Sequence, residues 1–201
     1  MQIRLLDDAL EERLKTAAEP GCAIRLGSQH YRVCQARLLE RVSWQDLRTP
    51  QGMRAWQVRF VSPTCARRRN RAAPLLSPDT LALGLAERWR LLDPSTAPAL
   101  PWLPGPGPVW ISDLDGHTEV QLLSRRPRRD GPRLQQEEVI SGFVGRVRYA
   151  CDHGTDAETA AFGALLAFAS FAGAGSHTAY GFGVVVPELT WQPPTIGASS
   201  R

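Results

Sequence analysis

The chain has 201 residues, of which 43% are hydrophobic and 22% are charged, and this composition excludes full disorder, collagen and a coiled coil. A net charge of +4 identifies no partner by itself. Lys15 is the single lysine among 24 basic residues, so the surface is rich in guanidinium groups, whose planar fork suits phosphate, although a coding bias towards arginine would give the same composition.

The four cysteines indicate neither a zinc site nor a disulfide scaffold. They are Cys22, Cys34, Cys65 and Cys151, and no two have the close spacing of metal ligands. The N-terminus lacks the apolar core of a signal peptide, and the most apolar run, residues 160–175, is too short to span a membrane. We therefore expect a cytosolic protein with reduced thiols and no metal or cofactor.

The first third of the chain alternates helical and strand patterns. Apolar residues recur every three or four positions from Ile3 to Ala17, which predicts a helix that stops before Pro20-Gly21. Residues 23–44 predict a short strand, a turn at Gly27-Ser28 and a longer strand. A turn at residues 49–52 follows, and then residues 55–64 predict a strand with Trp56, Val58 and Phe60 on one face.

The middle of the chain predicts one more helix and two strand regions. A helix is expected from Pro78 to Leu92, and the prolines of residues 94–108 then exclude regular structure. Residues 109–123 predict two strands joined by a tight turn at Asp115-Gly116. A basic loop over residues 124–133 leads to a strand over residues 137–151.

The last third predicts a buried helix, a glycine-rich loop and a final strand. Residues 156–172 are apolar almost all round, with Asp156 as the expected N-cap. Residues 173–183 form the loop and residues 184–191 the strand. From Trp56 onward the order is βαββαβ, the ferredoxin-like unit, which makes the fold α+β.

Residues 1–48 supply only a helix and two strands, which corresponds to the second half of another ferredoxin-like unit. We expect a partial N-terminal half-domain over residues 1–52 and a ferredoxin-like domain over residues 53–192. Residues 193–201 are expected to be a loose tail.

The glycine-rich loop is the sharpest chemical feature. It reads GAGSHTAYGFG, and glycines allow close backbone approach and positive φ. It is not a P-loop, because no lysine precedes Thr178, and its helix–loop–strand order is the reverse of a dinucleotide fingerprint. It follows a helix C-terminus, where the dipole is negative, so backbone N–H groups and Arg or His side chains would have to hold a phosphate. A tight helix-to-strand connection is the alternative.

Two arginine clusters indicate a polyanion partner. Residues 54–71 contain six arginines and no acid, and residues 124–133 contain five arginines and one acid. Solvated basic loops are the alternative. Among the histidines, His177 in the glycine-rich loop is the best candidate for acid–base chemistry, and His30 is second. We expect His117 and His153 to lie in surface turns.

Four segments together resemble a known family. The run GAGSHTAYGFGVV is similar to the C-terminal glycine-rich signature of CRISPR-associated endoribonucleases that cut precursor CRISPR RNA within its repeats, members of the RAMP superfamily. The run VRFVSPTCARRRN resembles the strand end of that family, ERWRLLD resembles the helix that follows, and SGFVGRVRY resembles its G-F-x-G strand. The match runs from about Gly21 to Trp191.

The resemblance implies two ferredoxin-like domains in tandem, with RNA held across them and against the glycine-rich loop. It also implies metal-independent cleavage, in which a 2′-hydroxyl attacks the adjacent phosphate. The chain begins about where the second half of the first domain would begin, so the part that usually carries a catalytic histidine is expected to be missing. His177 and His30 are then the candidate catalytic residues. The expected RNA-binding residues are Gly173, Gly175, Ser176, His177, Thr178, Gly181, Gly183, Arg67, Arg68, Arg69, Arg71, Arg125, Arg126, Arg128 and Arg129.

The expected partner is CRISPR repeat RNA, with other effector subunits or a second copy as further partners. Two alternatives to an enzyme stay open. One is a non-catalytic RNA-binding subunit of an effector complex. The other is an interaction protein whose arginine content reflects coding bias.

Overall fold

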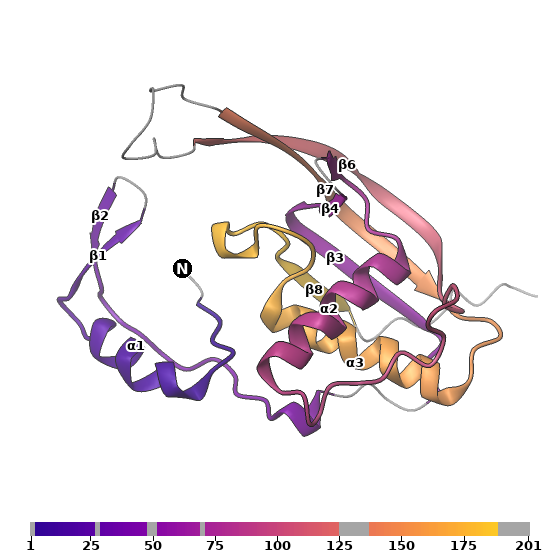
Figure 1. Cartoon of the computed structure of the whole chain (residues 1–201). Helices are drawn as coiled ribbons and strands as arrows, with labels where there is room; N and C mark the ends of the chain where they lie inside the picture. The colour runs from indigo at the N-terminus through magenta and orange to yellow at the C-terminus, as the bar shows by residue number, and fades with distance from the viewer. Residues whose placement is uncertain (1–2, 27–28, 48–51, 69–70, 125–136, 189–201) are drawn as a thin grey trace, which may run out of the picture.

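The chain from residue 55 onward contains a four-stranded antiparallel sheet with two helices on one of its faces (Figure 1). The computed structural model describes residues 3–26, 29–47, 52–68, 71–124 and 137–188. The sheet strands are β3 (Ala55–Thr64), β6 (Trp110–Ser124), β7 (Glu137–Ala150) and β8 (Val185–Glu188). The helices are α2 (Pro78–Leu92) and α3 (Asp156–Ala172).

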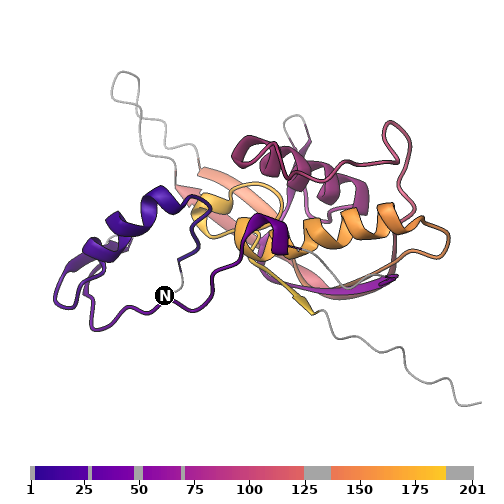
Figure 2. The ribbon, with the colours of Figure 1, turned by 90° about the horizontal axis from the view of Figure 1, so that it is seen from below.

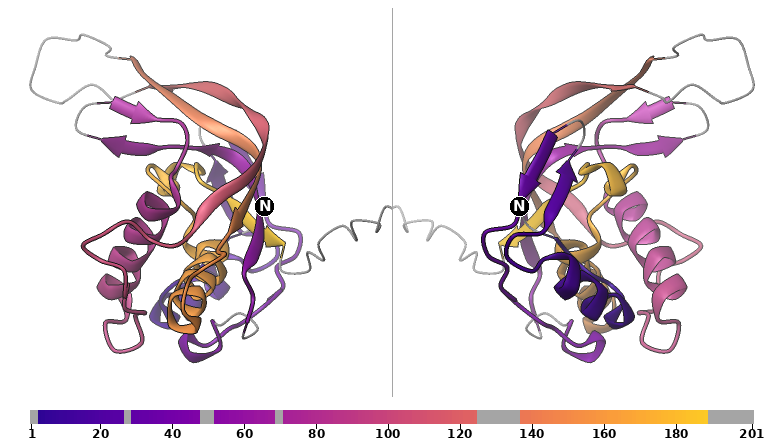
Figure 3. Two further views of the ribbon diagram at one scale, coloured as in Figure 1. Left: turned by 90° about the vertical axis from the view of Figure 1, so that its right-hand side faces the viewer. Right: turned by 90° about the vertical axis from the view of Figure 1, so that its left-hand side faces the viewer.

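The strands lie side by side in the order β6-β7-β3-β8, and all neighbours are antiparallel. Together with the βαββαβ order along the chain, this arrangement matches the predicted α+β, ferredoxin-like fold. Figures 2 and 3 show α2 and α3 side by side in a layer against the sheet. The open face of the sheet therefore carries the alternate residues of each strand.

The core lies between the sheet and the helices. Trp56, Val58 and Phe60 of β3 are all at most 2% exposed, which confirms the predicted inner face. Trp56 and Tyr149, cross-strand partners on β3 and β7, both make edge-on contacts with Phe162 of α3. Such aromatic pairs bury a large apolar area and fix the position of α3 across the sheet.

Both helices begin at a side-chain cap. The Ser77 hydroxyl accepts the backbone N–H of Thr80 at the start of α2. At the start of α3 the N-cap is Thr155 and not Asp156, which corrects the prediction. Thr155 and Glu158 form a reciprocal capping box: the Glu158 N–H donates to Thr155 Oγ1, and the Thr155 N–H donates to the Glu158 carboxylate.

The predicted turn at Asp115-Gly116 is wrong, because β6 runs through these residues without a break. Gly116 lies opposite Gly145 of β7. A Cβ at position 116 would come within 2.6 Å of the Phe143 ring and 2.4 Å of the Val144 carbonyl oxygen. Glycine at this position therefore allows the two strands to lie close together. The sequence Asp-Gly was interpreted as a turn because it usually occurs in hairpin turns.

The helix and the second strand of the N-terminal part are shorter than predicted. This part contains the 3-10 turn η1 (Asp8–Leu10), α1 (Glu11–Ala17), and the hairpin of β1 (Ala23–Leu26) and β2 (Gln29–Arg32). The helix starts later than expected, after the Asp7 side chain caps η1. The second strand ends at Arg32, so the long strand predicted up to residue 44 is wrong. The turns expected at residues 27–28 and 49–52 fall largely or wholly outside the described residues.

A short turn connects this part to the helical layer. Trp44 lies in the 3-10 turn η2 (Trp44–Asp46), and its ring is 5.4 Å from that of Trp89 and 5.6 Å from that of Phe168. Figures 1 and 2 show α1, β1 and β2 set apart from the sheet. The division into domains at residue 52 stays a prediction. No helix in the described part of the chain has the length and apolarity to cross a membrane.

Candidate functional site

The glycine-rich loop, residues 173–183, leads from the C-terminal end of α3 to β8, as predicted. It contains a 3-10 turn, η3 (Thr178–Tyr180). Five of its residues have positive φ: Gly173 at 72°, Gly175 at 74°, His177 at 63°, Gly181 at 85° and Gly183 at 68°. Among the described residues, His177 is the one non-glycine residue with positive φ, a conformation that L-residues other than Gly rarely adopt.

Two of the glycines are required because the backbone of another residue occupies the place where their Cβ would lie. A Cβ on Gly183 would be 1.9 Å from the Ala174 carbonyl oxygen, and one on Gly175 would be 2.3 Å from the Cys65 carbonyl oxygen. Gly181 differs, because a Cβ there meets nothing within 4 Å. The predicted tight connection therefore describes the two ends of the loop, and its middle faces open space.

The loop is bound to the end of β3 by three hydrogen bonds. The Gly183 N–H donates to the Pro63 carbonyl (3.0 Å), the Val184 N–H to Ser62 Oγ (2.9 Å), and the Ser176 N–H to the Cys65 carbonyl (2.8 Å). The β7 strand reaches the same place, since a Cβ on Gly142 would be 2.6 Å from the Thr64 nitrogen. The glycine-rich loop, the end of β3 and β7 thus meet at one junction. The sequence motifs in these three segments did not predict this contact.

This junction also brings the first arginine cluster to the loop. Cys65 directly precedes a small hairpin of β4 (Ala66–Arg68) and β5 (Arg71–Ala73). Arg67, Arg68 and Arg71 lie on its two strands, so the basic hairpin begins one residue from the carbonyl that holds Ser176. Arg69, Arg125, Arg126, Arg128 and Arg129 lie outside the described residues.

The two candidate histidines do not lie together. His177 is half-buried in the loop, with its ring 6.2 Å from that of Tyr180 and 6.1 Å from that of Phe182. Within the described residues its ring has no carboxylate partner. His30 is exposed on β2, in a hairpin that Figure 1 shows separated from the glycine-rich loop.

The other two histidines are exposed. His117 lies within β6 and not in the turn predicted for it, 3.3 Å from the Glu119 carboxylate. His153 lies between β7 and α3, as expected for a surface turn. Neither belongs to the glycine-rich loop.

The backbone at the middle of the loop offers hydrogen-bond donors. The N–H groups of His177, Thr178 and Ala179 donate to no acceptor among the described residues. Ala179 and Tyr180 are exposed, and 72% of Tyr180 is accessible to solvent. Successive N–H groups without an internal acceptor, at a turn that begins with a left-handed residue, can contact an anion.

The sequence analysis did not identify Arg88 of α2 as a functional residue. The Arg88 guanidinium donates to three carbonyls at the start of the loop: those of Ala172 (2.8 Å), Gly173 (2.9 Å) and Gly175 (2.9 Å). Burial lowers the pKa of Arg88 from its usual value. An arginine among the apolar residues of a helix face could have indicated a buried polar partner, although not which one.

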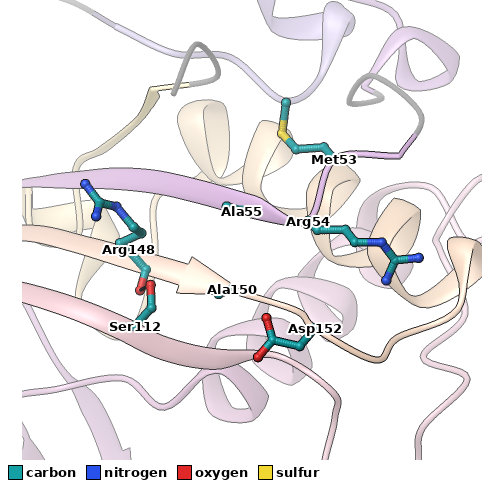
Figure 4. Close-up of a pocket in the computed structure, with 7 residues that line it drawn as sticks. All are labelled: Met53, Arg54, Ala55, Ser112, Arg148, Ala150 and Asp152. Atoms are coloured by element: carbon teal, nitrogen blue, oxygen red, sulfur yellow. Dashed lines mark hydrogen bonds between the residues drawn. The ribbon is translucent and has the colours of Figure 1, made fainter. Parts of the chain in front are cut away.

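A shallow depression elsewhere on the surface does not resemble a catalytic site. It is lined by residues at one end of β3, β6 and β7, among them Arg54, Arg148 and Asp152 (Figure 4). The guanidinium groups of Arg54 and Arg148 point to opposite sides in Figure 4, so they do not converge on one ligand. Across the described residues no three His, Cys, Asp or Glu side chains gather as a metal site.

Comparison with known proteins gives a consistent result. Residues 58–185, more than half of the chain, match the family model of the CRISPR-associated endoribonuclease Cas6. The structure is similar to that of a Cas6 (TTHA0078) product complex, with 29% identity, a TM-score of 0.66, and coverage of 92% of this chain and 77% of that chain. A substrate mimic complex of the same protein gives 28% identity, a TM-score of 0.61 and the same coverage.

Thermus thermophilus Cas6 (TTHB231) shares the fold, with 22% identity, a TM-score of 0.60, and coverage of 90% of this chain and 71% of that chain. No curated relative matches the chain at a significant level. The family model begins within β3 and ends at the first residue of β8, so it covers most of β3, all of β6 and β7, both helices of the layer and the glycine-rich loop. The chain belongs to the Cas6 family of CRISPR-associated endoribonucleases.

Proposed function

We propose that the chain binds CRISPR repeat RNA and cleaves precursor CRISPR RNA into guide RNA without a metal ion. In this reaction a 2′-hydroxyl attacks the adjacent phosphorus, the new 2′-O–P bond forms and the P–O5′ bond breaks. The hydroxyl proton passes to a base, and an acid protonates the leaving 5′-oxygen. The products are a 2′,3′-cyclic phosphate and a 5′-hydroxyl.

The observation that carries the proposal is the junction of the glycine-rich loop with the basic hairpin. The Ser176 N–H donates to the Cys65 carbonyl, and the hairpin with Arg67 and Arg68 starts at the next residue. An RNA backbone that follows the hairpin therefore reaches the exposed middle of the loop, where three N–H groups are available to a phosphate. Membership of the Cas6 family supports an RNA substrate.

His177 is the proposed acid or base at this place, because its ring lies on the loop beside those N–H groups. His30 is the second candidate. It reaches the same phosphate only if the β1–β2 hairpin moves towards the loop or RNA bridges the two parts. A second copy or other effector subunits are further proposed partners, and the cytoplasm is the proposed location.

One observation favours the alternative, a non-catalytic RNA-binding subunit. The described residues give the His177 ring aromatic neighbours and no carboxylate that would orient it. General acid–base catalysis depends on a positioned ring with a matched pKa. Under this alternative the loop and hairpin hold RNA, and no bond is broken.

The test is cleavage of the genomic repeat RNA by the purified chain in EDTA, with a second substrate that carries 2′-deoxy at each candidate position. We expect cleavage in EDTA that one 2′-deoxy substitution abolishes. The His177→Ala variant is expected to slow cleavage by about 10²–10⁴-fold, while His153→Ala, an exposed histidine outside the loop, leaves the rate unchanged. Salt-sensitive binding with no cleavage would establish the alternative, and full activity of His177→Ala would remove this histidine from the mechanism.

A further inference from the structure

The first turn of the glycine-rich loop is held by a guanidinium group from another helix. Arg88, in the last part of α2, donates from Nη1 to the carbonyls of Ala172 and Gly173 and from Nη2 to that of Gly175. All three distances are between 2.8 and 2.9 Å, in the range of good charged hydrogen bonds. The arginine thus binds the end of α3 and the loop in one fork.

The end of a helix needs such a partner. Its last carbonyls have no intrahelical donor, and together they carry a partial negative charge. That charge opposes the approach of a phosphate to any loop that starts there. Arg88 places a full positive charge on these carbonyls, so α3 can end directly beneath a segment proposed to meet RNA.

The hydrogen bonds of Arg88 also fix one particular peptide group. The Gly175 carbonyl, held by Arg88, and the Ser176 N–H, held by the Cys65 carbonyl, belong to the same peptide plane. The plane is therefore bound on both sides, from α2 and from the end of β3. His177, with its positive φ, is the second residue after Gly175, so a rotation of this plane would also shift the backbone that carries its ring.

We propose that Arg88 is a positioning residue, which orients the Gly175–Ser176 peptide so that the His177 ring and the N–H groups of residues 177–179 face RNA. This inference rests on the proposed function of the loop. A lysine at this position keeps the charge, but its ammonium is a point donor that cannot reproduce a planar fork across three carbonyls. Arg88→Lys therefore removes the planar fork and keeps the charge, whereas Arg88→Met removes both.

The experiment compares Arg88→Lys and Arg88→Met with Arg90→Met, whose side chain is exposed two residues further along α2. The first measurement is deuterium exchange of residues 173–183 in the free protein. We expect faster exchange in both Arg88 variants and wild-type exchange in Arg90→Met. Melting curves check that each variant is folded, and Arg88→Lys serves the test if Arg88→Met does not fold.

The second measurement separates RNA binding from the chemical step. With saturating repeat RNA, Arg88→Lys is expected to lower the single-turnover rate by about 10–100-fold while the Kd for a 2′-deoxy RNA changes less than about threefold, because a small misplacement affects reaction geometry more than binding. Arg88→Met is expected to weaken the Kd as well, since the charge is also lost. A purely structural role would not separate the rate from the Kd in this way.

The outcomes distinguish the two proposals. Wild-type loop exchange and wild-type rate in Arg88→Lys would overturn the role of Arg88, although the enzyme itself cleaves. Loss of loop protection in both Arg88 variants of a protein that binds RNA but never cleaves it would support the positioning role and refute the proposed catalysis.

Discussion

Replacement of Gly175 by alanine tests whether contact between backbone segments shapes the glycine-rich loop. Gly181→Ala is the matched control, since both glycines have positive φ, at 74° and 85°. Their surroundings differ: the added Cβ would be 2.3 Å from the Cys65 carbonyl oxygen at Gly175 and meets nothing within 4 Å at Gly181. The pair therefore separates the effect of steric contact from that of backbone conformation.

The expected magnitudes follow from these contacts. The left-handed conformation costs an alanine about 1–2 kcal/mol at either position. At Gly175 the carbonyl must also move by roughly 1 Å to restore ordinary contact. That shift breaks the Ser176–Cys65 hydrogen bond, which costs about 1 kcal/mol of stability. It also weakens the charged hydrogen bond from Arg88, which costs about 1.5 kcal/mol or more. We expect a total loss of about 4 kcal/mol for Gly175→Ala.

The assay is urea unfolding followed by circular dichroism, with thermal melting as a second measure. For a chain of this size the two losses correspond to a drop in Tm of about 10 °C for Gly175→Ala and about 4 °C for Gly181→Ala. RNA affinity, measured below the melting range, is expected to fall in Gly175→Ala because Ser176 is displaced. Equal losses of stability in the two variants would refute the steric argument.

Three further predictions concern other parts of the chain. The triple replacement of residues 67–69 by alanine should weaken RNA binding and reduce the slope of log K against log salt by up to about 2, and an unchanged slope in filter-binding titrations would exclude the hairpin from the RNA contact. Thr155→Ala should cost about 1 kcal/mol in urea unfolding because the capping box is lost. Asp156→Ala should cost less, since among the described residues the Asp156 carboxylate makes one ion pair, with the exposed Arg54 at 3.5 Å. Burial raises the pKa of Tyr149, whose hydroxyl has no partner among the described residues, so its contribution to stability is present below about pH 10 and is lost as the pH rises further. Tyr149→Phe should therefore lose less stability than wild type in unfolding titrations from neutral pH to pH 11, and a steeper loss would contradict the burial of this ring.

The elements that sequence patterns predicted well are those whose pattern reports directly on burial. Strand β3 and helices α2 and α3 have the predicted bounds, since their apolar residues recur with the period of the element and face one core. Residues 33–43 also contain apolar side chains, but they form no helix or strand, and Leu38 is 71% exposed. An apolar pattern predicts an element only where a partner surface covers it.

Contacts between segments that are distant in sequence could not be predicted from local sequence patterns. Gly116 is glycine because the Phe143 ring and Gly145 lie against it, and a local rule can only interpret Asp-Gly as a turn. Arg88 has its partners 84 to 87 residues further along the chain. No pattern within α2 reveals that the Arg88 guanidinium binds the last carbonyls of another helix.

The two interpretations of the glycine-rich loop, a tight connection and an RNA surface, apply to different residues. Gly175 and Gly183 are required by neighbouring backbone, so their presence is explained without RNA. Gly181 has a positive φ, open space around it and an exposed neighbour, Tyr180. His177 keeps a left-handed conformation that a glycine would adopt at lower energy, so its side chain must be favoured for another reason. A loop that only connected α3 to β8 would have no need of a histidine there, and this favours residues 177–181 as the part that acts on RNA.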